Sequence, residues 1–334
     1  MNEKIELVSD LKADDSINRQ FDKNNRGKLI DARSKFAEKR RINKFETTWL
    51  ETSKNKIIQS LDSDLDNTDQ LQIIINSFPQ EQIAEAFALS AKSFGCSDGR
   101  TSYEGEDNLV KLGMAGGGIM LFAREVKADG RLETNVEWLS RLHESTKFKN
   151  FLKTLIDLNV KEIYGHDECG AAEKVNGKEM GKTDPLIFSE YMVLSLEEMG
   201  YYITAKHLNL EGENQMRNDI HDERMLVLDG TGRFNPEKLG FPSHFMVNSP
   251  SFNAFAGENE PIVSDKDLLN ELETLCGVAK GHGFGAKFSE KEPFYIAITA
   301  KNQNQLDHLL KLAEDVKKRI PDMNIKINGY IYNN

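Results

Sequence analysis

Residues 147–170 read Lys147-Phe-Lys-Asn-Phe-Leu-Lys-Thr-Leu-Ile-Asp-Leu-Asn-Val-Lys-Glu-Ile-Tyr-Gly-His-Asp-Glu-Cys-Gly170, and this stretch decides the fold. Its first part, 147–158, places apolar residues at helical spacing. The short apolar run 160–164 that follows is typical of a buried strand. A helix that leads into a strand, with polar residues directly after the strand, is the pattern of an open α/β sheet. We therefore expect an α/β protein with a mostly parallel central sheet flanked by helices.

An earlier stretch has the same arrangement. Residues 86–94 precede Gly95-Cys-Ser-Asp-Gly-Arg100 and read as a buried strand, although 80–91 could equally form a helix. The chain between the two stretches is long enough for an α/β crossover, which would bring two strand ends side by side. The two polar segments would then meet at one edge of the sheet.

The residues of these segments have the composition of a metal centre. Cys96, His166 and Cys169 offer two thiolates and one imidazole, which suits zinc with three protein ligands and one exchangeable position, although cadmium or cobalt would fit the same donors. In extended backbone, residues two apart point to the same side, so Asp98 and Arg100 could face the same cavity as Cys96. The residues leave two other readings open: a structural zinc completed by Asp98, or unrelated buried cysteines.

The two segments also match a known family. Cys96-Ser-Asp-Gly-Arg100 and His166-Asp-Glu-Cys-Gly170 resemble the zinc site of the β-class carbonic anhydrases, and Ala115-Gly116 stands where that family has its Ala-Gly loop. The Asp-Gly-Arg wording is also similar to that of the cadmium-type carbonic anhydrases. The resemblance covers about residues 84–180. It implies a β-carbonic-anhydrase-like fold for that part of the chain.

The resemblance further implies roles for single residues. Cys96, His166 and Cys169 would hold one Zn²⁺ per chain, while Asp98 would either take the fourth position or be held away from it by Arg100. Zinc-bound hydroxide would then convert carbon dioxide reversibly to bicarbonate. Because two thiolates neutralise the charge of the ion, we expect activity to rise with pH above neutrality.

The glycine-rich loop would line the substrate pocket. By the resemblance, the pocket residues are Gly113, Ala115, Gly116 and Gly117. The chain has Gly113-Met114 where the family has Arg-Asn, and Gly99 where the family has Ser. These differences leave the identity of the substrate undecided. A hydrolase of carbonyl sulfide or carbon disulfide on the same scaffold is therefore an alternative. Taken by itself the loop could cradle a phosphate, but it lacks the GxGxxG order, which favours a packing turn.

We expect four segments along the chain. Residues 1–28 are polar and aperiodic and predict a flexible arm, and 29–80 predict an N-terminal helical arm whose long helix would span 29–59. The zinc core would span 81–232, and a C-terminal α/β extension, 233–334, would pack on it. We find no internal repeat at a solenoid-like period.

Two smaller features are interpreted as ordinary structure. Asp229-Gly-Thr-Gly-Arg233 reads as a plain turn, and Cys276 lies in a helix-like pattern that predicts a buried small hydrophobe. Three cysteines do not form a disulfide framework, so reduced thiols are expected. No run approaches about 18 apolar residues and the first residues do not resemble a signal peptide, so we expect a cytoplasmic location.

Charge and family resemblance together restrict the expected partners. The net charge of −11 argues against nucleic acid and against an anionic membrane surface. The resemblance implies a homodimer or a dimer of dimers in which an N-terminal helix reaches across the partner. A third function, from a different class, is a non-catalytic zinc-stabilised assembly module whose extensions bind other proteins.

Overall fold

The computed structural model describes residues 61, 67–101, 109–126, 135–167, 169–172, 184–209, 224–241, 244–255, 261–280, 288, 290 and 293–333. The flexible arm expected at 1–28 and the long helix expected at 29–59 lie outside these residues. Within them, no helix combines the length and apolar character that a bilayer span requires.

The described strands form two sheets of four, and all neighbouring strands run parallel. The first sheet has the order β2-β1-β3-β4, with β1 at Lys92–Cys96, β2 at Val110–Met114, β3 at Val160–His166 and β4 at Thr204–Leu208. The second has the order β6-β5-β7-β8, with β5 at Met225–Asp229, β6 at His244–Val247, β7 at Phe294–Ala300 and β8 at Ile325–Ile331. The expected α/β class with a parallel sheet and flanking helices is confirmed.

The two sheets have the same topology. In each, the strand that comes first in the chain lies between the second and the third, and the fourth lies at the outer edge. The C-terminal part of the chain therefore contains a complete sheet, and β5, which falls within the range expected for the core, belongs to that sheet. We call the parts built on the two sheets the first half and the second half.

Four helices of the described structure pack against one another beside the first sheet. They are α7 (Ile119–Val126), α8 (Asn135–Glu144), α9 (Thr146–Asp157) and α11 (Asp184–Glu198). The predicted helix and strand within 147–170 are confirmed as α9 and β3. Helix α9 begins after Ser145, whose hydroxyl accepts the Phe148 N–H at 3.1 Å, and a left-handed Asn159 (φ 58°) turns the chain into β3. Aromatic rings in edge-to-face contact, including Phe122 with Phe148, fill the space between α7 and α9.

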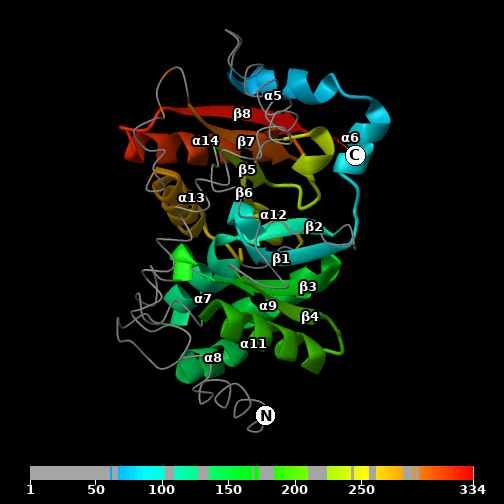
Figure 1. The fold of residues 1–334 in the computed structure, drawn as a ribbon, viewed down its shortest axis with the longest axis vertical. Helices are drawn as coiled ribbons and strands as arrows, with labels where there is room; N and C mark the ends of the chain where they lie inside the picture. The colour runs from blue at the N-terminus through cyan, green and yellow to red at the C-terminus, as the bar shows by residue number, and fades with distance from the viewer. Residues whose placement is uncertain are drawn as a thin grey trace, which may run out of the picture.

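The second half is covered partly by helices from the start of the chain. Helices α12 (Ser249–Phe255), α13 (Asp265–Ala279) and α14 (Gln303–Arg319) follow its strands. Helix α5 (Asn67–Asn76) packs on β8, and α6 (Gln80–Ala86) contacts a 3-10 turn at Pro236–Leu239, although both precede the first sheet in sequence (Figure 1). The segment 80–91, which the sequence left ambiguous, is helical to Ala86, and the strand begins at Lys92.

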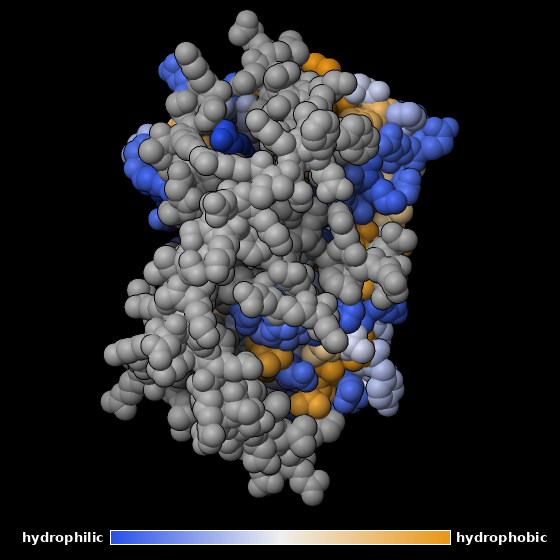
Figure 2. Space-filling model, viewed as in Figure 1, coloured by the Kyte–Doolittle hydropathy of each residue, from blue (hydrophilic) through white to orange (hydrophobic). Residues whose placement is uncertain are grey.

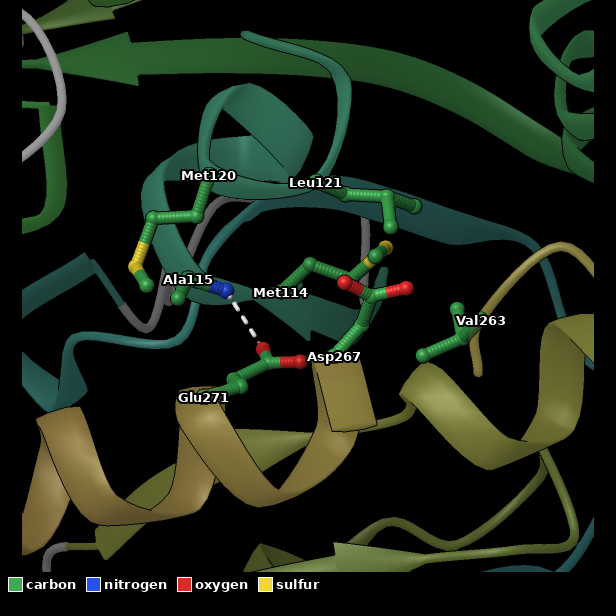
Figure 3. Close-up of a pocket in the computed structure, with 7 residues that line it drawn as sticks. All are labelled: Met114, Ala115, Met120, Leu121, Val263, Asp267 and Glu271. Atoms are coloured by element: carbon green, nitrogen blue, oxygen red, sulfur yellow. Dashed lines mark hydrogen bonds between the residues drawn. The ribbon is translucent and has the colours of Figure 1, made fainter. Parts of the chain in front are cut away.

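The two sheets meet at β2 and β6, which lie next to each other at mid-height in Figure 1. The Met246 N–H donates to the Ser97 carbonyl at 3.0 Å, and the Asn248 N–H donates to the Gly113 carbonyl at 2.8 Å. A Cβ at Gly113 would lie 2.1 Å from the Met246 carbonyl oxygen, so only glycine permits this approach. A small cavity remains where Ala115 faces α13 (Figure 3).

Large apolar side chains that are exposed are scattered over the described surface. They are Ile73, Leu89, Met199 and Tyr202. On the coloured part of Figure 2, hydrophobic residues are interspersed with hydrophilic ones. Single exposed apolar residues of this kind are normal for a folded protein and mark no binding surface.

Candidate metal centre

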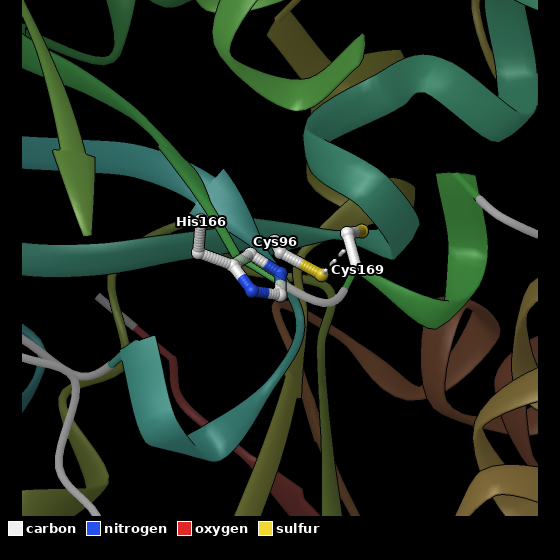
Figure 4. Close-up of side chains that lie close together, drawn as sticks. All are labelled: Cys96, His166 and Cys169. Atoms are coloured by element: carbon white, nitrogen blue, oxygen red, sulfur yellow. Dashed lines mark hydrogen bonds between the residues drawn. The ribbon is translucent and has the colours of Figure 1, made fainter. Parts of the chain in front are cut away.

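The three predicted ligand residues come together at the carboxyl end of the first sheet. Cys96 ends β1 and His166 ends β3, and these strands are parallel neighbours, so their ends meet. Cys169 lies directly before a helical turn at 170–172. All three side chains are buried, and their ligand atoms lie within 4.8 Å of one another (Figure 4). A buried group of this kind could hold a metal ion.

The distance between the two sulfurs fits a shared ion. Cys96 Sγ and Cys169 Sγ are 3.9 Å apart. Two thiolates bound to one tetrahedral zinc at about 2.3 Å each would be separated by about 3.8 Å. A disulfide requires about 2.05 Å, and both cysteines are free. The spacing therefore suits metal coordination.

The His166 ring is oriented by its neighbour in sequence. Its Nδ1 lies 2.7 Å from the carbonyl oxygen of Asp167, and because a carbonyl can only accept, Nδ1 carries the proton and donates. Nε2 then holds the lone pair that a metal needs. Histidine ligands commonly donate their other ring N–H to a carbonyl in this way. The Asp167 carboxylate contacts His207 Nε2 at 2.8 Å, which ties this segment to β4.

The thiol pair is electrostatically suited to a cation. The hydrogen bond from Cys169 lowers the pKa of Cys96 well below its usual value, and His166 lowers it further. The same bond, together with burial, raises the pKa of Cys169 well above its usual value. One sulfur therefore ionises readily while the other keeps its proton, because two adjacent buried anions repel each other. A bound dication would remove that repulsion and favour loss of the second proton.

In comparisons with protein-family models, curated proteins and solved structures, no match to this chain is found. The assignment of a metal site therefore rests on the donor set and its geometry. Two thiolates and an imidazole are soft and borderline donors, which zinc prefers over the oxygen ligands that magnesium and calcium require. Cys96, His166 and Cys169 could thus hold a metal ion, and their donor chemistry is compatible with zinc.

Asp98 lies beside the group without joining it. The set of ligand atoms within 4.8 Å of one another does not include its carboxylate. Its negative charge nonetheless raises the pKa of both Cys96 and Cys169, so it is close to the sulfurs. The backbone of Arg100 belongs to a 3-10 turn at Gly99–Thr101, but its side chain lies outside the described part of the structure. Pairing of Asp98 with Arg100 therefore stays a prediction.

The four predicted pocket residues divide into two pairs. Gly116 and Gly117 line a cavity together with Cys96 and His166, and both have positive φ angles, 65° and 61°, that glycine adopts without strain. The Gly116 N–H also donates to Cys96 Sγ at 3.3 Å. Gly113 and Ala115 instead face the second half: the first contacts β6 and the second contacts α13.

The rest of the cavity wall is mainly apolar. Beside the metal group, it is lined by Tyr164, Pro185, Phe188 and Met192. The Tyr164 hydroxyl is 3.3 Å from the Thr101 hydroxyl, and burial raises its pKa well above the usual value, so it stays protonated. A wall of this kind would admit a small neutral molecule more readily than an ion.

Glu271 of α13, which the sequence did not predict as a site residue, hydrogen-bonds to segments next to the candidate site. Its carboxylate is buried and accepts the Ala115 N–H at 2.6 Å. Burial raises its pKa to about 7, and hydrogen bonds from Ser249 and Ala115 oppose that rise. A signal was present: Glu271 shares helical spacing with buried Leu268 and Leu275, so it stands on the apolar face of α13.

Proposed function

We propose that this protein is a zinc enzyme that hydrates carbon dioxide reversibly to bicarbonate. The observation that carries the proposal is the buried Cys96, His166 and Cys169 group, because its donors and its sulfur spacing suit a three-ligand zinc with one exchangeable position. When bound, zinc would acidify a water molecule and so supply a nucleophile near neutral pH. The resemblance of the two motifs to β-class carbonic anhydrases supports the same reaction.

The chain's own residues would hold and shape this site. The Asp167 carbonyl fixes the His166 tautomer, and the Gly116 N–H stabilises the Cys96 thiolate. The apolar wall that includes Phe188 and Met192 would exclude water and receive a small linear molecule without charge. Carbon dioxide has that character. Carbonyl sulfide and carbon disulfide share it, so the proposal is tested against all three substrates.

The decisive experiment combines metal content with turnover. Protein loaded with zinc is assayed for carbon dioxide hydration by stopped flow between pH 6.5 and 9, beside Asp98→Ala. We expect about one zinc per chain, activity in the wild type that rises with pH, and reduced activity in Asp98→Ala with unchanged zinc content. Zinc content should not change because the Asp98 carboxylate lies outside the ligand group, whereas the resemblance implies that Asp98 acts at the fourth zinc position and so affects turnover.

Other results would replace the proposal. Zinc bound without turnover of any of the three substrates would leave a structural site, as in a zinc-stabilised assembly module. Turnover of carbonyl sulfide or carbon disulfide without carbon dioxide hydration would make the protein a hydrolase. Absence of bound zinc from protein that is folded and reduced would refute the metal site itself.

We also propose a homodimer in the reducing cytoplasm, on the resemblance and on the free cysteines. The β2 edge of the first sheet is already covered by β6 of the same chain, so a second copy would have to bind elsewhere. Light scattering at micromolar protein concentration measures this directly, and a monomer there would contradict the dimer.

A further inference from the structure

We propose that Glu271, which belongs to the second half, is a positioning residue for the metal centre of the first half. The proposal rests on the proposed function only in taking Cys96 as a metal ligand. Glu271 is not one of the three proposed ligands; its hydrogen bonds reach the segments that hold the Cys96 sulfur in place.

Its contacts reach both of those segments. Glu271 Oε1 accepts the Ala115 N–H at 2.6 Å and lies 3.4 Å from the Ser97 hydroxyl, which donates to it. Ser97 directly follows Cys96, and Ala115 directly precedes Gly116, whose N–H donates to Cys96 Sγ. One carboxylate therefore joins the chain just after the sulfur-bearing residue to the loop that hydrogen-bonds the sulfur.

The other oxygen of the carboxylate holds the second half in the same arrangement. Glu271 Oε2 accepts a short hydrogen bond from the Ser249 hydroxyl. Ala115 begins the helical turn that follows β2, and Ser249 begins α12, the helix that follows β6. Glu271 thus bridges the corresponding loops of the two sheets, at the place where β2 and β6 meet.

Burying a carboxylate at this position is energetically unfavourable. Glu271 is only 5% exposed, and burial without partners would cost several kcal/mol. Its polar contacts are directed at Ala115, Ser97 and Ser249. Figure 3 shows the side chain pointing from α13 toward Ala115, beside a small cavity into which this loop could shift. Removing the carboxylate would leave the Ala115 N–H buried without its acceptor.

The test uses cobalt(II) in place of zinc, because thiolate-to-cobalt absorption bands report ligand geometry without any turnover. We compare the wild type with Glu271→Ala and Glu271→Gln, and use Glu273→Gln as the matched control. Glu273 lies on the same helix, but its carboxylate is exposed and pairs with Arg319. We expect Glu271→Ala to shift the bands and weaken cobalt affinity about 10- to 100-fold. Glu271→Gln keeps an acceptor for Ala115 and should restore most of both.

A further substitution at the same position, Glu271→Asp, keeps the test decisive if Glu271→Ala does not fold. Glu271→Asp retains the charge but shortens the reach by one methylene, so it too should alter the cobalt spectrum. Wild-type bands and wild-type affinity in folded Glu271→Ala or Glu271→Asp would overturn the inference. The proposed function fails separately, when the wild type binds cobalt and zinc but turns over no substrate.

Discussion

The two halves of the molecule share one strand order but differ at the carboxyl ends of their central strands. In the first half, Cys96 and His166 end β1 and β3 and converge with Cys169. In the second half, the corresponding strands β5 and β7 end at Asp229 and Ala300. The same scaffold thus carries a metal-type donor set at one end and a single carboxylate at the other.

Both oxygens of the Asp229 carboxylate accept hydrogen bonds from neutral donors. Oδ1 of Asp229 accepts from the Thr231 N–H at 2.8 Å and from the hydroxyls of Thr231 and Thr299 at 2.6 and 2.8 Å. Oδ2 accepts from Asn248 Nδ2 at 2.8 Å and the Phe234 N–H at 3.3 Å. Five hydrogen bonds close this end of the sheet. The two sheets therefore differ in the chemistry of the side chains at their strand ends and not in strand order.

The largest effect is expected where the first half would lose a ligand. Cys169→Ala removes one of three donors, so zinc content should fall from about one per chain to near zero. The proposed hydration of carbon dioxide should fall at least about 1,000-fold, because no other Cys, His, Asp or Glu in the described structure joins the group. Metal analysis and stopped-flow assays measure both. Cys276→Ala, which removes the buried cysteine of α13, is the control and should keep its zinc.

Removing the Asp229 side chain, at the corresponding strand end of the second half, should lower stability without changing zinc content. Asp229→Ala would leave several buried donors without an acceptor, and we expect a loss of about 3–5 kcal/mol in the free energy of unfolding. Zinc per folded chain should stay that of the wild type. Urea unfolding measures the loss. Asp322→Ala, at an exposed ion pair with Lys280, is the control and should change stability by less than about 1 kcal/mol. Loss of zinc from folded Asp229→Ala would show that the hydrogen bonds around Asp229 also support the metal site.

This contrast explains what the sequence could predict. The grouping of the three candidate ligands was predictable because few residue types bind zinc and because each stretch that carries them follows a recognisable strand. From sequence alone, the Asp229-Gly-Thr-Gly-Arg233 segment reads as a plain turn. Its hydrogen-bond partners are distant in sequence: Thr299 lies in β7, and Asn248 directly follows β6. The repeated strand order leaves no readable repeat in the sequence, because the strands of the two sheets share little beyond their apolar character.

The position of Glu271 shows the same limit. The spacing along α13 places it among buried leucines, but only the tertiary fold brings its carboxylate to the Ala115 N–H. Likewise, the need for glycine at position 113 arises from the carbonyl of Met246 and not from a substrate. Features that depend on contact between the two halves were therefore not readable from either half.

The smallest effect concerns a lysine at the boundary between the halves, and its sign is unusual. Lys92 begins β1 and is fully buried, and its Nζ has no hydrogen-bond partner within the described structure. Burial lowers its pKa to about 8, although the negative charge of Asp229 opposes the shift. At pH 7 the folded protein therefore holds a buried, poorly compensated cation, while the unfolded chain holds a solvated one.

Replacing this lysine should stabilise the protein. Lys92→Met keeps the length and apolar stem, and we expect a gain of about 1–3 kcal/mol in the free energy of unfolding at pH 7. The lowered pKa means that the wild type releases its proton in the folded state first, so its stability rises as pH increases from about 8 toward 10.5. The advantage of Lys92→Met should therefore shrink over that range. Urea unfolding at pH 7, 8 and 9.5 measures both the gain in stability at pH 7 and its decrease with pH. A lower stability of Lys92→Met at pH 7 would mean that attraction to Asp229 outweighs the desolvation of Lys92. Asp229 would then act as the counterion of Lys92.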